Sequence, residues 1–99
     1  LLVDCLTLWL SNLMEAGRDP EVETGTLLAA LREVVAPVVM VSNEVGLGIV
    51  PMGELTRRFA DAAGRLNQAI AARADRVILV VAGLPLVIKD APQERTLFA

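Results

Sequence analysis

Residues 42–51 read Ser-Asn-Glu-Val-Gly-Leu-Gly-Ile-Val-Pro and directly follow the apolar run 38–41. A short, mostly β-branched run without polar alternation is typical of a parallel strand that is covered on both faces. Ligands of open α/β sheets bind beyond the carboxyl ends of such strands. We therefore expect a ligand-facing loop here, with an ordinary strand-to-helix connection as the alternative. The candidate contacts of this loop are Asn43, Glu44, Gly46 and Gly48.

The apolar residues predict strands that alternate with helices. Spacings of three and four residues indicate helical faces, and continuous aliphatic runs indicate buried strands. In order, we expect a strand at 1–3, helices at 6–14 and from about 21 or 24 to 35, a strand at 38–42, a helix at 54–74, a strand at 76–81, and an extended segment or strand at 87–89. This order predicts an α/β fold in which right-handed crossovers build a largely parallel sheet flanked by helices.

Length and composition indicate part of a larger fold. The chain has 99 residues, of which 55% are hydrophobic and 21% charged. This apolar fraction fits central strands without a solvent face, and α/β folds of this kind usually need more than about 100 to 150 residues for a closed core. Because Leu1 opens the chain as if in mid-strand, we expect the carboxyl-terminal part of a longer protein. Residues 1–89 would belong to a single domain, with 90–99 as a loose tail.

Several classes of partner and site are disfavoured by composition. The net charge is −3, and no cluster of Lys and Arg interleaved with aromatic residues offers a nucleic-acid surface. No apolar stretch reaches the roughly 18 to 20 residues of a membrane span. Histidine is absent, which excludes His-based acid/base chemistry and His-metal sites within these residues. The single cysteine, Cys5, is expected to be a small buried residue in a reducing cytoplasm.

Asp4 follows the first apolar run and lies where a nucleotide-bound metal could be held. A carboxylate at a strand end can bind Mg²⁺ next to the phosphates of a nucleotide. The structural alternative is that Asp4 caps the following helix. A phosphate-binding Gly-x-x-x-x-Gly-Lys-Ser/Thr sequence is absent, and the Gly46–Gly48 pair lacks the third glycine of a dinucleotide fingerprint because Pro51 stands there.

For three further residues the sequence pattern does not distinguish a contact with a ligand from a structural role. Arg65 could contact phosphates, and it follows Gly64 in the middle of a predicted helix. Glycine costs about 1 kcal/mol relative to alanine there, which predicts close packing or an approaching ligand. Thr7, one helical turn after Asp4, is expected to cap or pack.

Four segments together resemble one family. They are residues 3–13, 43–51, 58–68 and 83–89, and the string Asn-Glu-Val-Gly-x-Gly-Ile-Val-Pro at 43–51 is the most specific of them. In order and spacing they are similar to the carboxyl-terminal half of the bifunctional adenosylcobinamide kinase / adenosylcobinamide-phosphate guanylyltransferases of cobalamin biosynthesis. The resemblance covers residues 1 to about 89. One departure is Met-Gly-Glu at 52–54, where the family suggests an acid and an asparagine.

The resemblance implies a P-loop, RecA-like fold with a mainly parallel sheet, here lacking its amino-terminal part. Such enzymes phosphorylate adenosylcobinamide with ATP or GTP and then transfer GMP from GTP to that phosphate, giving adenosylcobinamide-GDP. Asp4 matches an acidic position that contacts the nucleotide or its Mg²⁺, directly or through water. Homo-oligomers are also implied.

The same resemblance places the family's catalytic groups outside these residues. Its Walker A loop and its guanylylated histidine both precede the position that matches Leu1, so no catalytic residue is expected here and the 99 residues alone should be inactive. The alternative from a different class is a non-catalytic scaffold or oligomerisation piece, whose strand edges would pair with another chain. An unrelated dinucleotide-binding module is disfavoured by the absent fingerprint.

Overall fold

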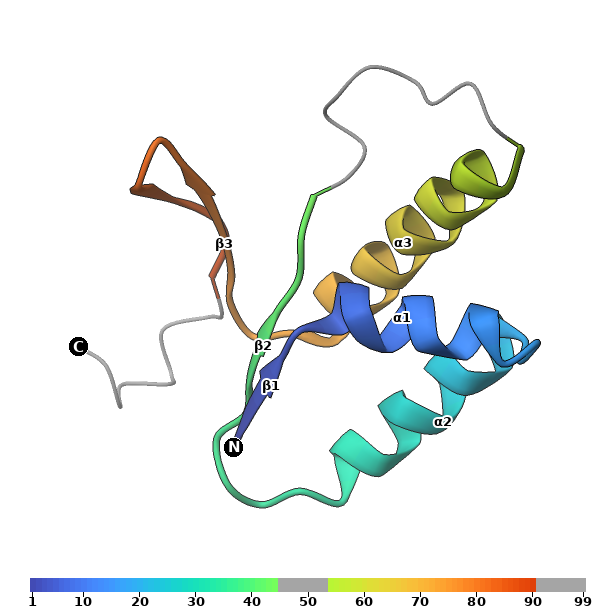
Figure 1. Ribbon diagram of the computed structural model, residues 1–99. Helices are drawn as coiled ribbons and strands as arrows, with labels where there is room; N and C mark the ends of the chain where they lie inside the picture. The colour runs from blue at the N-terminus through green and yellow to red at the C-terminus, as the bar shows by residue number, and fades with distance from the viewer. Residues whose placement is uncertain (45–53, 91–99) are drawn as a thin grey trace. The chain divides into compact units, whose positions relative to one another are not determined.

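The computed structural model describes residues 1–44 and 54–90. The chain divides into two units, Leu1–Ala69 and Ile70–Ala99. In chain order the elements are β1 (Leu2–Asp4), α1 (Leu6–Glu15), α2 (Pro20–Arg32), β2 (Val39–Val41), α3 (Glu54–Arg73), β3 (Val77–Val81) and β4 (Leu84–Lys89) (Figure 1). The predicted helices and the first three predicted strands are confirmed to within a few residues at their ends.

The first unit contains the parallel strand pair that the sequence predicts. β1 and β2 lie side by side, with Leu2 opposite Val39 and Asp4 opposite Val41 (Figure 1). Two helices, α1 and α2, connect them in the chain, as a parallel pair requires. The α/β character of the chain is therefore confirmed, and both strands end at the same edge of their sheet.

Buried side chains from α1 and α3 form the core of the first unit. Leu6 and Leu10 are four residues apart and therefore share one face of α1, where Leu10 is fully buried. On the part of α3 that belongs to this unit, Ala62, Ala63 and Leu66 are buried, again with helical spacing. This core places the first turn of α1 and the middle of α3 on a rigid base.

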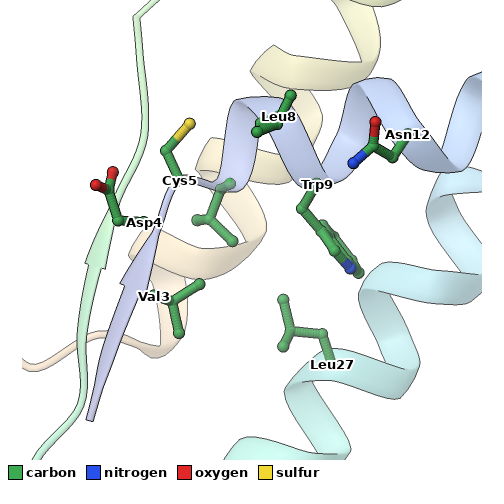
Figure 2. A pocket seen from close by; sticks show the side chains of 8 residues that line it. Val3, Asp4, Cys5, Leu8, Trp9, Asn12 and Leu27 are labelled. Carbon is green, nitrogen blue, oxygen red and sulfur yellow. The ribbon is translucent and has the colours of Figure 1, made fainter.

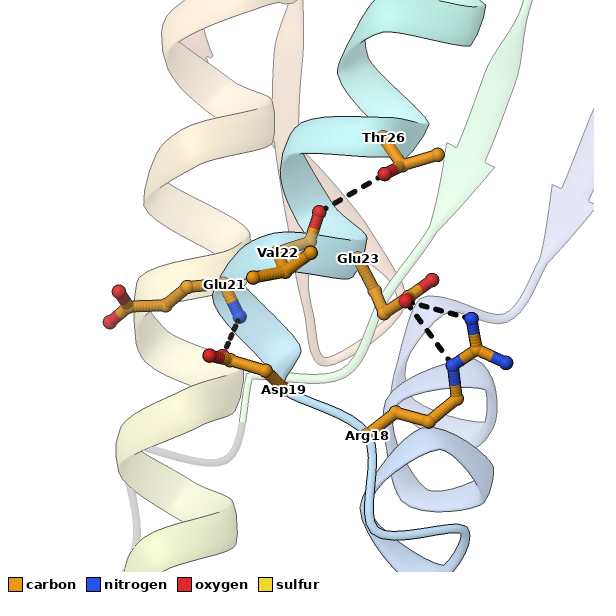
Figure 3. Close-up of polar contacts among 6 residues, drawn as sticks. All are labelled: Arg18, Asp19, Glu21, Val22, Glu23 and Thr26. Atoms are coloured by element: carbon orange, nitrogen blue, oxygen red, sulfur yellow. Dashed lines mark hydrogen bonds and ion pairs between the residues drawn. The ribbon is translucent and has the colours of Figure 1, made fainter.

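The start of α2 is fixed by local polar contacts. The Asp19 carboxylate accepts a hydrogen bond of 2.9 Å from the Glu21 backbone N–H, and Pro20 occupies the first helical turn (Figure 3). Both features are typical of a helix N-terminus. Arg18 adds an ion pair of 2.9 Å to Glu23. The chain therefore leaves α1 and enters α2 at a defined point.

The second unit contains an antiparallel hairpin. β3 pairs with β4 in antiparallel register, with Val81 opposite Leu84. The described residues give β3 an antiparallel partner, the next strand in the chain, which the predicted element order did not specify, and a parallel neighbour for β3 stays a prediction. The reason for the antiparallel pairing is local: Ala82 and Gly83 both have positive φ, 52° and 75°, and such a two-residue turn joins antiparallel strands.

Polar contacts at the open end of the hairpin link β4 to the end of α3 and join the residues that flank the two strands. Lys89 donates hydrogen bonds to the carbonyls of Ala71 and Ala72 in the last turns of α3, at 2.8 and 3.2 Å. Arg76 and Asp90 form an ion pair of 3.1 Å. The predicted loose tail begins at Asp90, which is thus held, while the remainder of that segment lies outside the described residues.

The strands are more exposed than their sequences predict. Leu2 is 65% exposed and Val39 60%, and every residue of β4 is exposed. The expectation of strands covered on both faces is wrong for the part of the chain that the structure describes. Each strand there pairs with one neighbour only. No described helix has the length and hydropathy to cross a bilayer.

Gly64 is not held by close packing, contrary to one of the two expectations for it. A Cβ at this position would meet no atom within 4 Å, and the same is true of Gly25 in α2. We expect Gly64→Ala to stabilise the full-length protein by about 0.5–1 kcal/mol, because alanine restricts the unfolded chain and favours helix. Urea unfolding measures this, with Gly25→Ala as the matched control. If only Gly64→Ala destabilises, the open surface at Gly64 is occupied in solution.

Candidate functional site

Two strand ends that carry polar residues meet at one edge of the first unit. Because β1 and β2 are parallel and Asp4 is opposite Val41, residues 42–44 continue from the same edge at which Asp4 lies. Ser42, Asn43 and Glu44 are all exposed there, as is Asp4. We call residues 42–44 the strand-end corner. This is the edge at which open α/β sheets bind ligands.

The Asp4 carboxylate is available for a ligand. Figure 2 shows it pointing away from the Trp9 ring, and no hydrogen bond to this side chain is found within residues 1–44 and 54–90. The N-cap of α1 is Cys5, which makes no side-chain capping bond. The alternative that Asp4 serves to cap α1 therefore finds no support in the structure.

Asp4 also borders a hollow of about 330 Å³ beside β1, α1 and α2. Trp9 and Leu27 point toward one another across it (Figure 2). Its other lining residues are Val3, Cys5, Leu6, Leu8 and Asn12. The hollow is thus mainly apolar, and Trp9 lies in a setting that suits packing against aliphatic side chains. Cys5 is half-buried, close to its expected role as a small packed residue.

A polar network holds the strand-end corner. The Thr7 hydroxyl oxygen accepts a hydrogen bond of 2.9 Å from the Asn43 backbone N–H. The Asn67 amide nitrogen donates to the Asn43 carbonyl at 3.3 Å, and the Asn67 amide oxygen accepts from the Ser42 hydroxyl at 2.7 Å. Sequence reasoning missed Asn67. A polar residue with poor helix propensity beside buried Leu66 was the available signal.

The remaining predicted contacts are placed as follows. Arg65 forms an ion pair of 3.4 Å with Glu21 of α2, and its side chain is 57% exposed. Such exposed pairs are weak, so the guanidinium could exchange Glu21 for a phosphate, and this role stays a prediction. Gly46 and Gly48 lie outside the described residues. Asn43 and Glu44 are brought to the same sheet edge as Asp4.

Among the described residues, Asp4 could contribute a ligand to a magnesium ion at this edge. Mg²⁺ is usually bound through one or two carboxylates together with waters and substrate phosphates. Asp4 supplies one exposed carboxylate, and no group of three or more metal-ligating side chains is found in the part of the chain that the structure describes. A role for Asp4 in holding the Mg²⁺ of a nucleotide therefore stays a prediction.

The family model and the curated relatives that match this chain point to the same family. The family model for cobinamide kinase / cobinamide phosphate guanyltransferase matches residues 1–88. The bifunctional adenosylcobalamin biosynthesis protein CobP of Pseudomonas aeruginosa is 54% identical over 95 residues, which cover 93% of this chain and 54% of that protein.

Two further relatives are both named bifunctional adenosylcobalamin biosynthesis protein CobU. The Salmonella typhimurium protein is 43% identical and the Escherichia coli protein 40% identical, each over 104 residues. Each match covers 90% of this chain and 58% of the relative. The chain thus spans little more than half the length of the curated relatives it matches.

Proposed function

The chain belongs to the cobinamide kinase / cobinamide phosphate guanyltransferase family, and from this we propose that it is part of an enzyme of cobalamin biosynthesis. The full-length protein would phosphorylate adenosylcobinamide with ATP or GTP. It would then transfer GMP from GTP to adenosylcobinamide phosphate, giving adenosylcobinamide-GDP. The names of the three relatives, each called a bifunctional adenosylcobalamin biosynthesis protein, support this proposal.

The single observation that carries the site assignment is the exposed Asp4 carboxylate beside the strand-end corner. Asp4 would hold the Mg²⁺ of GTP or ATP, directly or through its water ligands. When bound, that ion neutralises charge on the phosphates. Asn43 and Glu44 would offer polar groups to the nucleotide or the corrinoid from the neighbouring strand end.

We propose that β1 and β2 form part of a P-loop, RecA-like sheet. The sequence contains neither a Gly-x-x-x-x-Gly-Lys-Ser/Thr motif nor a histidine. The Walker A loop and the guanylylated histidine would therefore belong to the part of the relatives' length that this chain does not match. The exposed apolar side chains of β1 and β2 support further cover on the faces of this sheet, and their single pairing among the described residues leaves edges at which further strands would pair. On this proposal the 99 residues alone are inactive, and the full-length protein is a cytoplasmic homo-oligomer.

Labelled nucleotides test the proposal on the full-length protein. With α-³²P-GTP and Mg²⁺ we expect acid-labile label on the protein, because a guanylylated histidine carries an acid-sensitive P–N bond. That label should move to adenosylcobinamide phosphate when it is added. With γ-³²P-ATP or γ-³²P-GTP, label should appear on adenosylcobinamide. The 99-residue chain, purified separately, is the matched control and should take up no label.

The outcomes distinguish three possible functions of the full-length protein. Label that forms on the protein and moves to the corrinoid phosphate supports the guanylyltransferase, and kinase activity without protein label leaves only the first reaction. Absence of both contradicts the proposal and favours a non-catalytic scaffold. The exposed apolar residues of β3 and β4 are the observation that favours this second candidate, which predicts association with another chain and no chemistry.

A further inference from the structure

Both backbone polar groups of Asn43 are held by side chains from different helices. Strand pairing ends where Asp4 faces Val41, since β1 then gives way to α1. Beyond this point the sheet offers no partner to the Asn43 N–H, and Thr7 from the first turn of α1 accepts its hydrogen bond. The Asn43 carbonyl accepts from Asn67 on α3. The chain is therefore fixed for two residues after the ladder ends.

The two side chains that hold Asn43 are anchored on the core. Thr7 follows Leu6, which is 2% exposed, and Asn67 follows Leu66, which is 3% exposed. Asn67 also accepts the Ser42 hydroxyl, so one amide binds two successive residues of the strand-end corner. Groups on packed helices hold a neighbouring segment more precisely than groups on loops do.

Two of the three hydrogen bonds use the backbone of Asn43, and the third uses the Ser42 hydroxyl, so none of them involves the Asn43 side chain. Since the backbone is fixed, the Asn43 and Glu44 side chains start from fixed positions at the edge that carries Asp4. We propose that Thr7 and Asn67 are positioning residues, which set the strand-end corner against Asp4 for nucleotide chemistry. This inference rests on the function proposed above. Displacement of reacting groups by about 1 Å can lower a rate by about 100-fold.

Steady-state kinetics of GMP transfer by the full-length protein test this role. Thr7→Val removes the acceptor with little change in shape, and Thr7→Ser retains it. Asn67→Ala removes both amide contacts, and exposed Gln68→Ala on the same helix is the control. We expect Thr7→Val and Asn67→Ala to lower kcat by about 10- to 100-fold with KM for GTP changed less than about threefold. Thr7→Ser and Gln68→Ala should stay within about twofold of the parent protein.

A double variant adds a second readout. Thr7→Val and Asn67→Ala act on the same residue, so the loss of kcat in the double variant should be smaller than the product of the two single losses. Melting temperatures measured in parallel give the folded fraction. If kcat per folded molecule is unchanged in both single variants, their role is structural only and the inference is overturned. The same holds if Thr7→Ser loses as much activity as Thr7→Val.

Asp4→Asn distinguishes failure of this inference from failure of the proposed function. If Asp4→Asn loses activity while Thr7→Val and Asn67→Ala retain it within about twofold, only the positioning role is wrong. If Asp4→Asn keeps full activity, or the parent protein transfers no GMP, the proposed function fails at this site and the positioning role falls with it.

Discussion

Asp4→Asn in the full-length protein is expected to lower kcat for nucleotide chemistry by about 100- to 1000-fold. The substitution keeps the shape of the side chain but removes the negative charge that would hold Mg²⁺ next to the phosphates. Asp4 is exposed, and within residues 1–44 and 54–90 its side chain makes no hydrogen bond, so folding should be little affected. Kinase and GMP-transfer rates measured over a range of Mg²⁺ concentrations check the expectation.

Glu15→Gln is the matched control for this substitution. Glu15 is an exposed acid at the opposite end of α1, so its neutralisation changes the net charge equally without touching the strand ends. Its rates should stay close to those of the parent protein. If Asp4→Asn is equally active, or if both variants lose activity together, Asp4 does not act on the nucleotide and the site assignment is wrong.

Leu10→Ala is expected to destabilise the protein by about 2–5 kcal/mol. Leu10 is 0% exposed and lies on the buried face of α1, so the shorter side chain leaves a cavity and loses apolar contacts. Urea unfolding followed by circular dichroism measures the change in the free energy of unfolding. Since Thr7 is one turn before Leu10 on the same helix, displacement of α1 should also weaken the hold on Asn43.

Leu8→Ala is the control, because Leu8 lies on the same helix and is 60% exposed. It should cost less than about 1 kcal/mol, as exposed substitutions usually do. A cost below about 1 kcal/mol for Leu10→Ala would contradict the described core. Equal, large costs for both variants would instead show that further residues of the full-length protein cover the Leu8 side of α1.

Local rules account for most of what the sequence predicted. The apolar spacing placed α1 and α3, and Pro20 after Asp19 marks the start of α2. These features depend on neighbours in the chain, so they can be read without a fold. The β3–β4 hairpin also has a local cause, and Ala82 before Gly83 between two aliphatic runs was its signal. The element order alone did not predict this antiparallel pairing, and a parallel neighbour for β3 stays a prediction.

Burial of the strands could not be read from their composition. Continuous aliphatic runs indicate strands that need cover on both faces, yet Leu2, Val39 and Val80 are each at least 60% exposed. The composition of a strand indicates whether its faces need to be covered, while its actual burial depends on which other residues lie against it. The chain matches little more than half the length of its curated relatives, so that requirement is not met by the described residues alone.

The amino-acid sequence was sufficient for the helices, the α/β class, the family and the placement of Asp4 at a strand end, because periodicity, turn chemistry and motif spacing are properties of neighbouring residues. The tertiary structure decided which strand ends meet and what holds them. Thr7 and Asn67 are 60 positions apart in numbering and both reach Asn43. Such a network depends on the packing of α1 and α3, which brings distant side chains to one backbone position and which no local pattern encodes.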